Sequence, residues 1–524
     1  MQGFLGIAHP VSRNTCQTLP KYDRIVTMSG LILYSVNPRS LGPVPEWMAA
    51  LNEAERLGCN AIYLDPFHTV TAAQKNYQGQ TVSGSLYAIR DHFTVNPEFC
   101  GGADQATARA QLADFIHIAR VRKFRVMTDL VFNHVAMDHP LILDHPDFFK
   151  HNPDGSLFAP GPANDPWSDI AQIDYDHPAA WDYFLGDNGY WLRLIDDYLD
   201  LGFNAFRCGA VYWLPHLVWE QTLNYALRRE PDTLVLAEGL GFAGQDAELM
   251  SHTLRESDAR IIYDLCYDDV GRHWDGCNVA ALNRARAARR AQAAHYGTMG
   301  FVDGHNFMPR AAEWRKKLAD DPDADRKIGA ICLRDYAIAC FTNNSVMIPR
   351  GYQWCVENNI GHFREQVSPV PFQAIKAERQ QRASPLALGP AIAEMHKIRT
   401  GLPAHARVEL TNAFPLDESN LTALQCDFYP MGNQQVAATI IVLLNTAPEI
   451  GTQQFPEDWW RKIKDGQSNA QRLQFGADRA KQDQISGVAI LVVPGGLPVL
   501  RQLTPDARIA LNQSAPELTP AWVA

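Results

Sequence analysis

The sequence has few of the features that identify a metal, membrane or nucleic-acid protein. Its ten cysteines are scattered without a CxxC pair, so neither a zinc site nor a compact disulfide framework is indicated. It contains no run of about 18 apolar residues, which excludes an ordinary membrane-spanning helix. The net charge is -11, and the one stretch rich in arginine, "RARAARRAQ" at 284–292, is typical of an exposed helix face. We therefore do not expect a nucleic-acid partner.

Targeting and cofactor motifs are also lacking. The N-terminus "MQGFLGIAHPVSRNTCQ" has no positively charged start, and His9 and Pro10 interrupt its short apolar run. Because a signal peptide needs both features, we expect a cytoplasmic protein. No phosphate-binding GxxxxGK or dinucleotide-binding GxGxxG follows an expected strand, and no HExxH motif occurs. The sequence therefore predicts neither a cofactor nor a bound metal.

What the sequence does have is an alternation of short β-branched or aromatic runs with longer amphipathic segments. Between the short runs lie helix-like stretches such as "WLRLIDDYLDLG", a pattern that favours a parallel sheet covered by helices. Repeated strand–helix units over roughly 370 residues predict an α/β fold, a (β/α)8 TIM barrel. The eight runs expected to be strands are 31–36, 59–67, 124–134, 203–208, 233–240, 260–267, 297–306 and 345–351.

Two parts of the chain fall outside this repeat. An insertion rich in Pro, Asp and His at 139–181 follows the third expected strand and is too long for an ordinary connection. On a barrel, such a loop usually shapes the substrate cleft. After residue 400 the chain contains strand-like runs only, among them "AATIIVLLN" and "GVAILVVP", which predict a C-terminal all-β sandwich domain. The predicted organisation is an N-terminal extension (1–30), a barrel (31–400) and a β-sandwich (401–524).

Polar side chains collect at the C-terminal ends of four expected strands, where a barrel of this kind places its active site. A lone polar residue at a strand end is usually a loop hydrogen-bonder, but four strand ends in order indicate a site. The residues are Asp129, Asn133 and His134 after the third strand, Arg207 after the fourth, Glu238 after the fifth, and Asp303, His305 and Asn306 after the seventh.

The segments "DLVFNH", "FNAFRCGA", "LAEG" and "FVDGHN" resemble the four short sequence regions of the α-amylase superfamily, glycoside hydrolase family 13. Two further segments, "LYAIRDHFTVNPEFCGG" and "NNSVMIPRGYQWCVEN", are similar to the family's loop after strand two and to its strand eight. The stretch "DHPLILDHPDFFKHNPDGS" looks like the maltosyltransferases that transfer maltose from maltose 1-phosphate onto α-1,4-glucan. The resemblance therefore implies a cleft for α-glucan or maltooligosaccharide.

The resemblance also assigns roles to individual residues. Family enzymes cleave α-glucosidic bonds with retention, which requires a nucleophilic carboxylate, a protonated acid and a third carboxylate that holds the sugar. Glu238 is the implied acid/base, and its apolar neighbours Leu236 and Ala237 favour the raised pKa that an acid needs. Arg207 is the implied partner of the nucleophile. The implied substrate-binding residues are Tyr87, which stacks on the sugar at the cleavage point, Asp91, Asp129, His134, Arg207 and His305.

The chain departs from the family at two of its three acids. Gly209 occupies the position of the nucleophilic Asp, and Asn306 occupies the position of the third acid. Glycine has no side chain to attack an anomeric carbon, and Asn carries no negative charge, so the usual double displacement cannot run. Loss of a nucleophile in other enzymes lowers the rate by roughly 10⁴- to 10⁶-fold.

Three explanations stay open. Gly209 is an engineered substitution, or the chain is a natural non-catalytic protein, or another carboxylate replaces the nucleophile. Asp303 is the best replacement on sequence grounds because it lies three residues before Asn306, although a hydrogen bonder at the barrel rim is the favoured interpretation. Cys208 adjoins Gly209, but neighbouring strand residues point to opposite faces, so we expect a buried structural thiol.

The sequence also bears on the donor. Where the resembling maltosyltransferases have lysines that help hold the donor phosphate, this chain has "GPANDPWSDI", with Asp165 and Pro166. An acid there disfavours a dianionic phosphate, so maltose 1-phosphate is not the preferred substrate.

The predicted function is an α-glucan-active hydrolase or glucan/maltosyl transferase of the α-amylase type, with Gly209 and Asn306 placing the activity of this form in doubt. The alternative is a noncatalytic protein that binds α-glucan or acts as a scaffold. A third reading is a subunit of a hetero-oligomer, as in the amino-acid transporter heavy chains that resemble amylases; the lack of a membrane anchor counts against it. The oligomeric state is left open.

Overall fold

The computed structural model describes residues 30–75, 80–161, 166–238, 265–268, 297–381 and 386–402. In the C-terminal part it describes 406–415, 420–430, 433–449, 453–466, 470–475, 484–485 and 488–494. The expected strand at 260–267 is therefore described only in part, and the predicted N-terminal extension and the arginine-rich stretch at 284–292 lie outside the described residues.

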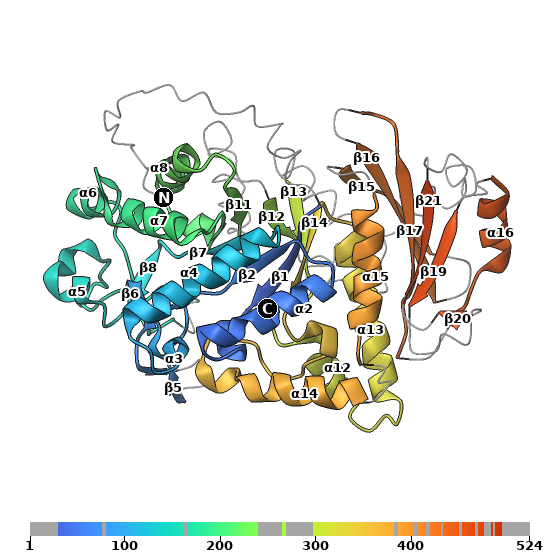
Figure 1. Cartoon of the computed structure of the whole chain (residues 1–524), viewed down its shortest axis with the longest axis horizontal. Coiled ribbons are helices and arrows are strands. Elements are labelled where there is room, and N and C mark those ends of the chain that lie inside the picture. The colour runs from blue at the N-terminus through green and yellow to red at the C-terminus, as the bar shows by residue number, and fades with distance from the viewer. Residues whose placement is uncertain are drawn as a thin grey trace.

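Within these ranges, eight parallel strands close into a barrel, which confirms the predicted (β/α)8 fold (Figure 1). Each strand pairs in parallel with the next around the barrel, and β14 closes it against β1. In barrel order the strands are β1 (Ile32–Val36), β2 (Ala61–Leu64), β7 (Arg125–Leu130), β10 (Ala205–Cys208), β11 (Leu234–Ala237), β12 (Leu265–Asp268), β13 (Gly297–Gly300) and β14 (Ser345–Pro349).

Helices between the strands cover the outside of the barrel (Figure 1). Their ends follow local chemistry: the Asp104 side chain accepts a hydrogen bond from Thr107 N at the start of α4, and α7 ends at Gly202, whose φ of 101° favours glycine. The helices are α2 (Met48–Arg56), α3 (Pro97–Cys100), α4 (Gln105–Val121), α5 (Pro140–Asp144), α6 (Pro178–Leu185), α7 (Tyr190–Leu201), α8 (His216–Arg229), α12 (Arg310–Lys317), α13 (Ala324–Phe341), α14 (Pro369–Gln381) and α15 (Gly389–Thr400).

Alternate strand residues divide between two cores. Tyr63, Met127, Ala205 and Leu236 belong to the cluster that fills the barrel, whereas Phe206 belongs to the layer between strands and helices. Cys208 is fully buried in that outer layer, as the sequence predicts. The same alternation directs Arg207 inward, opposite Asp129 of β7 and Leu236 of β11 in the strand register.

The loops after the barrel strands carry small antiparallel pairs of strands. The insertion after β7 contains α5 and the pair β8 (His134–Ala136) and β9 (Ile170–Gln172). The segment after β2 contains β3 (His68–Val70) paired with β6 (Ile89–Val95), and β4 (Ala73–Lys75) paired with β5 (Thr81–Ser83). These pairs stiffen the loops that follow the C-terminal ends of β2 and β7.

The C-terminal part contains β-sheets, as predicted, and also a helix that an all-β prediction leaves out. One face of the main antiparallel sheet packs through Ile440 and Val442 into the core that contains α13, and the other packs through Ile441 and Leu443 with Ile463 of α16. The elements are β15 (Ala406–Pro415), β16 (Leu421–Pro430), β17 (Ala438–Asn445), β18 (Gln453–Gln454), α16 (Glu457–Gly466), β19 (Gln471–Phe475), β20 (Gln484–Ile485) and β21 (Val488–Pro494).

Among the residues that the structure describes, no helix combines the length and the apolar character needed to cross a bilayer.

His396 of α15 joins three elements of the barrel's outer layer. Its Nδ1 donates to the carbonyl oxygen of Leu57 at 2.6 Å, which leaves Nε2 to accept from the Tyr336 hydroxyl of α13 at 2.6 Å. Burial lowers the pKa of His396 from its usual 6.5 to about 4. The neutral form is thus favoured in the folded protein.

We predict that His396 makes folding stability depend on pH. The unfolded chain takes up a proton near pH 6.5 and the folded chain only near pH 4, so stability is full above pH 6.5 and falls by up to about 3 kcal/mol as the pH drops to 4. Urea unfolding from pH 7 to 4.5 should show a shallower decline for His396→Gln. The control His117→Gln, at an exposed position of α4, should keep the original decline. Equal declines in all three proteins would contradict the prediction.

Candidate active site

Arg207 is the centre of a buried charge cluster at the C-terminal mouth of the barrel. Its Nη1 donates a hydrogen bond to Oδ1 of Asp129, and its Nη2 lies 3.3 Å from Oε2 of Glu238. Arg207 is 1% exposed, Asp129 2% and Glu238 9%. Burial alone would lower the pKa of Arg207, but Tyr63, Asp129 and Glu238 raise it overall, so the guanidinium is charged.

Two tyrosines complete the environment of Asp129. The hydroxyls of Tyr63 and Tyr87 donate to its Oδ2 at 2.5 Å and 3.1 Å. Burial raises the pKa of both hydroxyls, so they keep the protons that they donate. Burial also raises the pKa of Asp129, and the neighbouring Arg207 offsets this only in part. Both oxygens of Asp129 are thus held by protein groups.

Glu238 follows β11 directly, and the chain after β10 orients it. Its Oε2 accepts a hydrogen bond from the backbone N–H of Ala210 at 2.6 Å. Ala210 has a left-handed φ of 44°, which turns the chain sharply after Gly209 and directs this N–H toward Glu238. The ends of β10 and β11 therefore form one unit around Arg207.

Gly209 leaves room for a side chain beside Arg207. A Cβ built there would lie 3.6 Å from the carbonyl oxygen of Leu130 and 3.8 Å from Nη1 of Arg207, both ordinary contacts. Its φ is outside the left-handed region that favours glycine. Neither backbone nor packing requires glycine here, so a larger residue at this position would face the guanidinium.

Three rings lie together beside the cluster. The His305 ring centroid is 5.1 Å from that of Tyr87 and 4.5 Å from that of His362. His134 Nε2 donates to the Tyr87 carbonyl oxygen at 3.0 Å and so supports the Tyr87 loop. Burial lowers the pKa of His134 and of His305 to about 4, which keeps both rings neutral at pH 7. The sequence analysis missed His362, because no motif marks the loop after β14 around it.

The other predicted site residues lie apart from Arg207. Asp303 accepts hydrogen bonds from the Arg310 N–H through both oxygens, at 3.0 Å and 3.2 Å, and so caps the start of α12. β13 ends at Gly300, before Asp303, so strand pleating does not decide where its side chain points. Asn306 is exposed. Asp91 lies on β6, where its Oδ1 accepts from Phe93 N at 2.9 Å.

Two tryptophans that the sequence analysis did not single out lie side by side. Trp213 follows Gly209 by four residues. Its ring centroid is 5.0 Å from that of Trp167, which belongs to the insertion after β7. Trp167 is 41% exposed. The two indole rings are tilted by 36° to each other, and such a partly exposed pair offers apolar faces with polar edges, suited to a ligand that is itself partly apolar.

A second group of buried histidines lies where the insertion begins. The ring of His92 is 5.9 Å from those of His68 and His139, and burial lowers the pKa of His68 to about 3 and of His139 to about 4. Across the part of the chain that the structure describes, no three His, Cys, Asp or Glu side chains are arranged to hold a metal ion.

Replacing Arg207 should destabilise the protein strongly. Arg207→Leu leaves Asp129 and Glu238 buried without their cation, and we expect unfolding in urea at pH 7 to lose roughly 3–5 kcal/mol. Gly209→Ala is the matched control at the same site: because its Cβ fits, we expect a gain of about 0.4–1 kcal/mol. A neutral Arg207→Leu, or a strongly destabilising Gly209→Ala, would contradict this geometry.

Comparisons with known proteins show which families the chain resembles. Residues 24–154 match the family model of the glycogen debranching enzyme glucanotransferase domain. The chain is 26% identical over 222 residues to an α-1,4-glucan:maltose-1-phosphate maltosyltransferase of Picrophilus torridus, and 21% identical over 393 residues to that of Bifidobacterium longum. The alignments cover 39% and 73% of this chain but 32% and 48% of those proteins. The chain thus spans half or less of the length of these relatives.

Solved structures give the same fold. An α-amylase from Lactobacillus plantarum matches with a TM-score of 0.60 at 18% identity, over 90% of this chain and 99% of that chain. A maltogenic α-amylase from Thermotoga neapolitana matches with a TM-score of 0.58 at 17% identity, over 90% and 98%. Over parts of its length the chain therefore resembles the glycogen debranching glucanotransferase domain and the maltosyltransferases, and it has the fold of the α-amylase structures.

Proposed function

We propose that this chain is an α-glucan-active protein of the α-amylase hydrolase/transferase type, which binds α-1,4-linked maltooligosaccharide or glycogen at the mouth of its barrel. The observation that carries the proposal is the Arg207 cluster, in which Asp129 and Glu238 converge on one guanidinium from neighbouring strand ends. Relatives named as maltosyltransferases and a matching glucanotransferase model support the same substrate class.

In this proposal Glu238 is the acid/base, and the rings around it bind the sugar. Tyr87 stacks on the sugar at the cleavage point, and His305 hydrogen-bonds its hydroxyls. His134 acts through Tyr87, whose carbonyl oxygen it binds. Asp129 holds Arg207 rather than the sugar, since protein groups occupy both of its oxygens.

The missing nucleophile limits the chemistry. With Gly209 beside it, Arg207 pairs with Glu238 instead of a nucleophilic carboxylate. Asp303 replaces the nucleophile poorly, because its carboxylate caps α12. Glucan is the proposed ligand in preference to maltose 1-phosphate; Asp165, the residue that bears on the donor phosphate, lies outside the described residues.

A second candidate function is noncatalytic binding of α-glucan. Gly209 and Asn306 favour it, because a binding protein needs neither a nucleophile nor a third acid. The two functions share the ligand and differ in turnover, so one experiment distinguishes them.

The test restores the missing acids. We expect the unmodified chain to bind maltotetraose in a calorimetric titration with almost no product release. The Cβ of Gly209→Asp would make only ordinary contacts next to Arg207, and with Asn306→Asp this variant should raise product formation by roughly 10⁴- to 10⁶-fold, the effect of a nucleophile in other enzymes. A sensitive assay of reducing ends or transfer products measures this gain.

Glu238→Gln, added to the restored variant, is the control and should abolish the gain. Turnover by the unmodified chain would show that another group attacks, and Asp303→Ala would then be the next variant. Absence of maltotetraose binding in every form would overturn the α-glucan proposal.

A further inference from the structure

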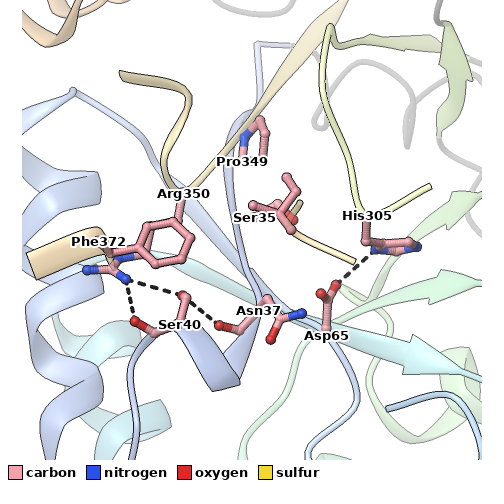
Figure 2. A pocket seen from close by; sticks show the side chains of 9 residues that line it. Ser35, Asn37, Ser40, Asp65, His305, Pro349, Arg350 and Phe372 are labelled. Carbon is pink, nitrogen blue, oxygen red and sulfur yellow. Dashed lines mark hydrogen bonds and ion pairs between the residues drawn. The ribbon is translucent and has the colours of Figure 1, made fainter. Parts of the chain in front are cut away.

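A small polar cavity adjoins the charge cluster, where β1, β2 and β14 end (Figure 2). Its volume of about 10 Å³ is close to the space that one water molecule needs. Its walls come from β1 and β14, from the segments that follow β1, β2, β13 and β14, and from α14. The lining side chains that carry polar groups are Ser35, Asn37, Ser40, Asp65, His305 and Arg350.

Asp65 is the one carboxylate among these lining residues, and the chain holds it firmly in place. It follows β2 directly, its N–H donates to the carbonyl oxygen of Val36 at 3.1 Å, and it is 2% exposed. Its Oδ1 lies 3.3 Å from Nδ1 of His305 and makes no hydrogen bond of good geometry within the described residues. A buried carboxylate oxygen in this condition is costly to keep, which favours a functional reason for it.

The arrangement of His305 supplies that reason. Figure 2 shows its ring directed toward the carboxyl of Asp65. The His305 side chain is 10% exposed, and its ring lies beside that of Tyr87, with 5.1 Å between the centroids. The two residues come from different strand ends, and His362 and Arg207 also lie near enough to Asp65 to lower its pKa.

We propose that Asp65 is a positioning residue for sugar binding, which holds Nδ1–H of His305 so that Nε2 accepts a hydrogen bond from a hydroxyl of the bound glucan. Asp65 thereby supplies, next to His305, the negative charge that Asn306 does not carry. This inference rests on the proposed function, because the ligand is the same α-glucan.

The chemistry follows from the two states of an imidazole. A neutral ring with its proton on Nδ1 has an acceptor at Nε2, and a carboxylate at Nδ1 fixes that tautomer. Protonation of Asp65 removes the negative charge that favours Nδ1–H, and the new O–H can donate to Nδ1 instead, so the tautomer of His305 is no longer fixed. Hydrogen bonds in unliganded sites are often long and shorten when substrate binds, which is consistent with the present 3.3 Å.

Asp65 rather than His305 titrates near neutral pH. Burial raises the pKa of Asp65 to about 6, while His362 and Arg207 oppose the rise; burial lowers the pKa of His305 to about 4. Binding that depends on the Asp65 carboxylate is therefore present above pH 6 and lost as the pH falls through 6. The titratable and charged groups that face Asp65 are Tyr63 from β2, Asp129 from β7, Arg207 from β10, Tyr87 from the loop before β6, His305 from the loop after β13 and His362 from the loop after β14.

The test measures maltotetraose affinity by calorimetry between pH 5 and 7.5. For the unmodified chain we expect a loss of about tenfold on going to pH 5, the size of one charge-assisted hydrogen bond. Asp65→Asn should have the weak affinity at both pH values. Asp169→Asn is the matched control, because Asp169 is also buried with a pKa raised to about 6 but belongs to the insertion after β7. It should keep the original pH profile. An Asp65→Asn variant with the unmodified profile would overturn the proposal.

A second measurement needs no sugar. Histidine-selective ¹⁵N labelling, with His305 assigned through His305→Gln, should show the Nδ1–H tautomer at pH 7.5 and its loss in Asp65→Asn. Unchanged His305 shifts in that variant would also overturn the proposal. If no form binds maltotetraose, the proposed function fails while these shifts still decide the pairing. The urea midpoint of Asp65→Asn at pH 7.5 should not fall, since the change removes a buried charge, so lost binding would not reflect unfolding.

Discussion

The buried guanidinium of Arg207 is the constraint on which the mouth of the barrel depends. A cation this deeply buried is tolerated only with anions in contact, and parallel strands in register provide them: Asp129 lies opposite Arg207 on β7, and Glu238 follows β11 on the other side. Tyr63 and Tyr87 then satisfy the remaining oxygen of Asp129. The fold itself thus brings together groups that are far apart in the sequence.

Gly209 changes what this cluster does without disturbing how it is built. The position is neither strained nor crowded, so the glycine reflects no demand of the backbone. Retaining glycosidases separate the roles of two carboxylates by giving them different environments. In the proposed function one of the two is missing at Gly209, and Arg207 lies 3.3 Å from Glu238. A cluster in which the guanidinium has carboxylate partners but no attacking group stands beside it fits sugar binding better than bond cleavage.

The sequence predicted the barrel because strand and helix periodicities are local, and it predicted Arg207, Asp129 and Glu238 because strand ends converge in a barrel. It did not predict the contact between Asp65 and His305. Asp65 follows a short buried strand and belongs to no motif. Its partner His305 comes much later in the chain, after the seventh barrel strand. For Asp303 the sequence favoured a hydrogen bonder at the barrel rim over a replacement nucleophile, and the carboxylate does accept hydrogen bonds from Arg310 N–H; which group it binds depends on where β13 ends, and strand ends are the least certain feature of a pattern. Helix α16 was missed because its short amphipathic sequence lies among strands. The sequence does not show that this segment covers one face of the C-terminal sheet.

The carboxylates at the mouth of the barrel contact protein groups, and these contacts limit what each carboxylate can do for a bound sugar. Asp129 is fully engaged in holding Arg207, Glu238 is shared between Arg207 and the turn after Gly209, and Asp65 faces His305 from the cavity. Each acid is thus bound to a protein group that it orients, and none occupies the space beside Gly209 that faces Arg207. In the proposed function a sugar would lie against the rings of Tyr87 and His305 rather than between them, since their centroids are 5.1 Å apart, and Gly209 would leave the side of attack without a carboxylate. Within the proposed function, the difference between a glucan-binding protein and a glucan-cleaving enzyme therefore lies in two acids, since Gly209 supplies no attacking group and Asn306 supplies no negative charge.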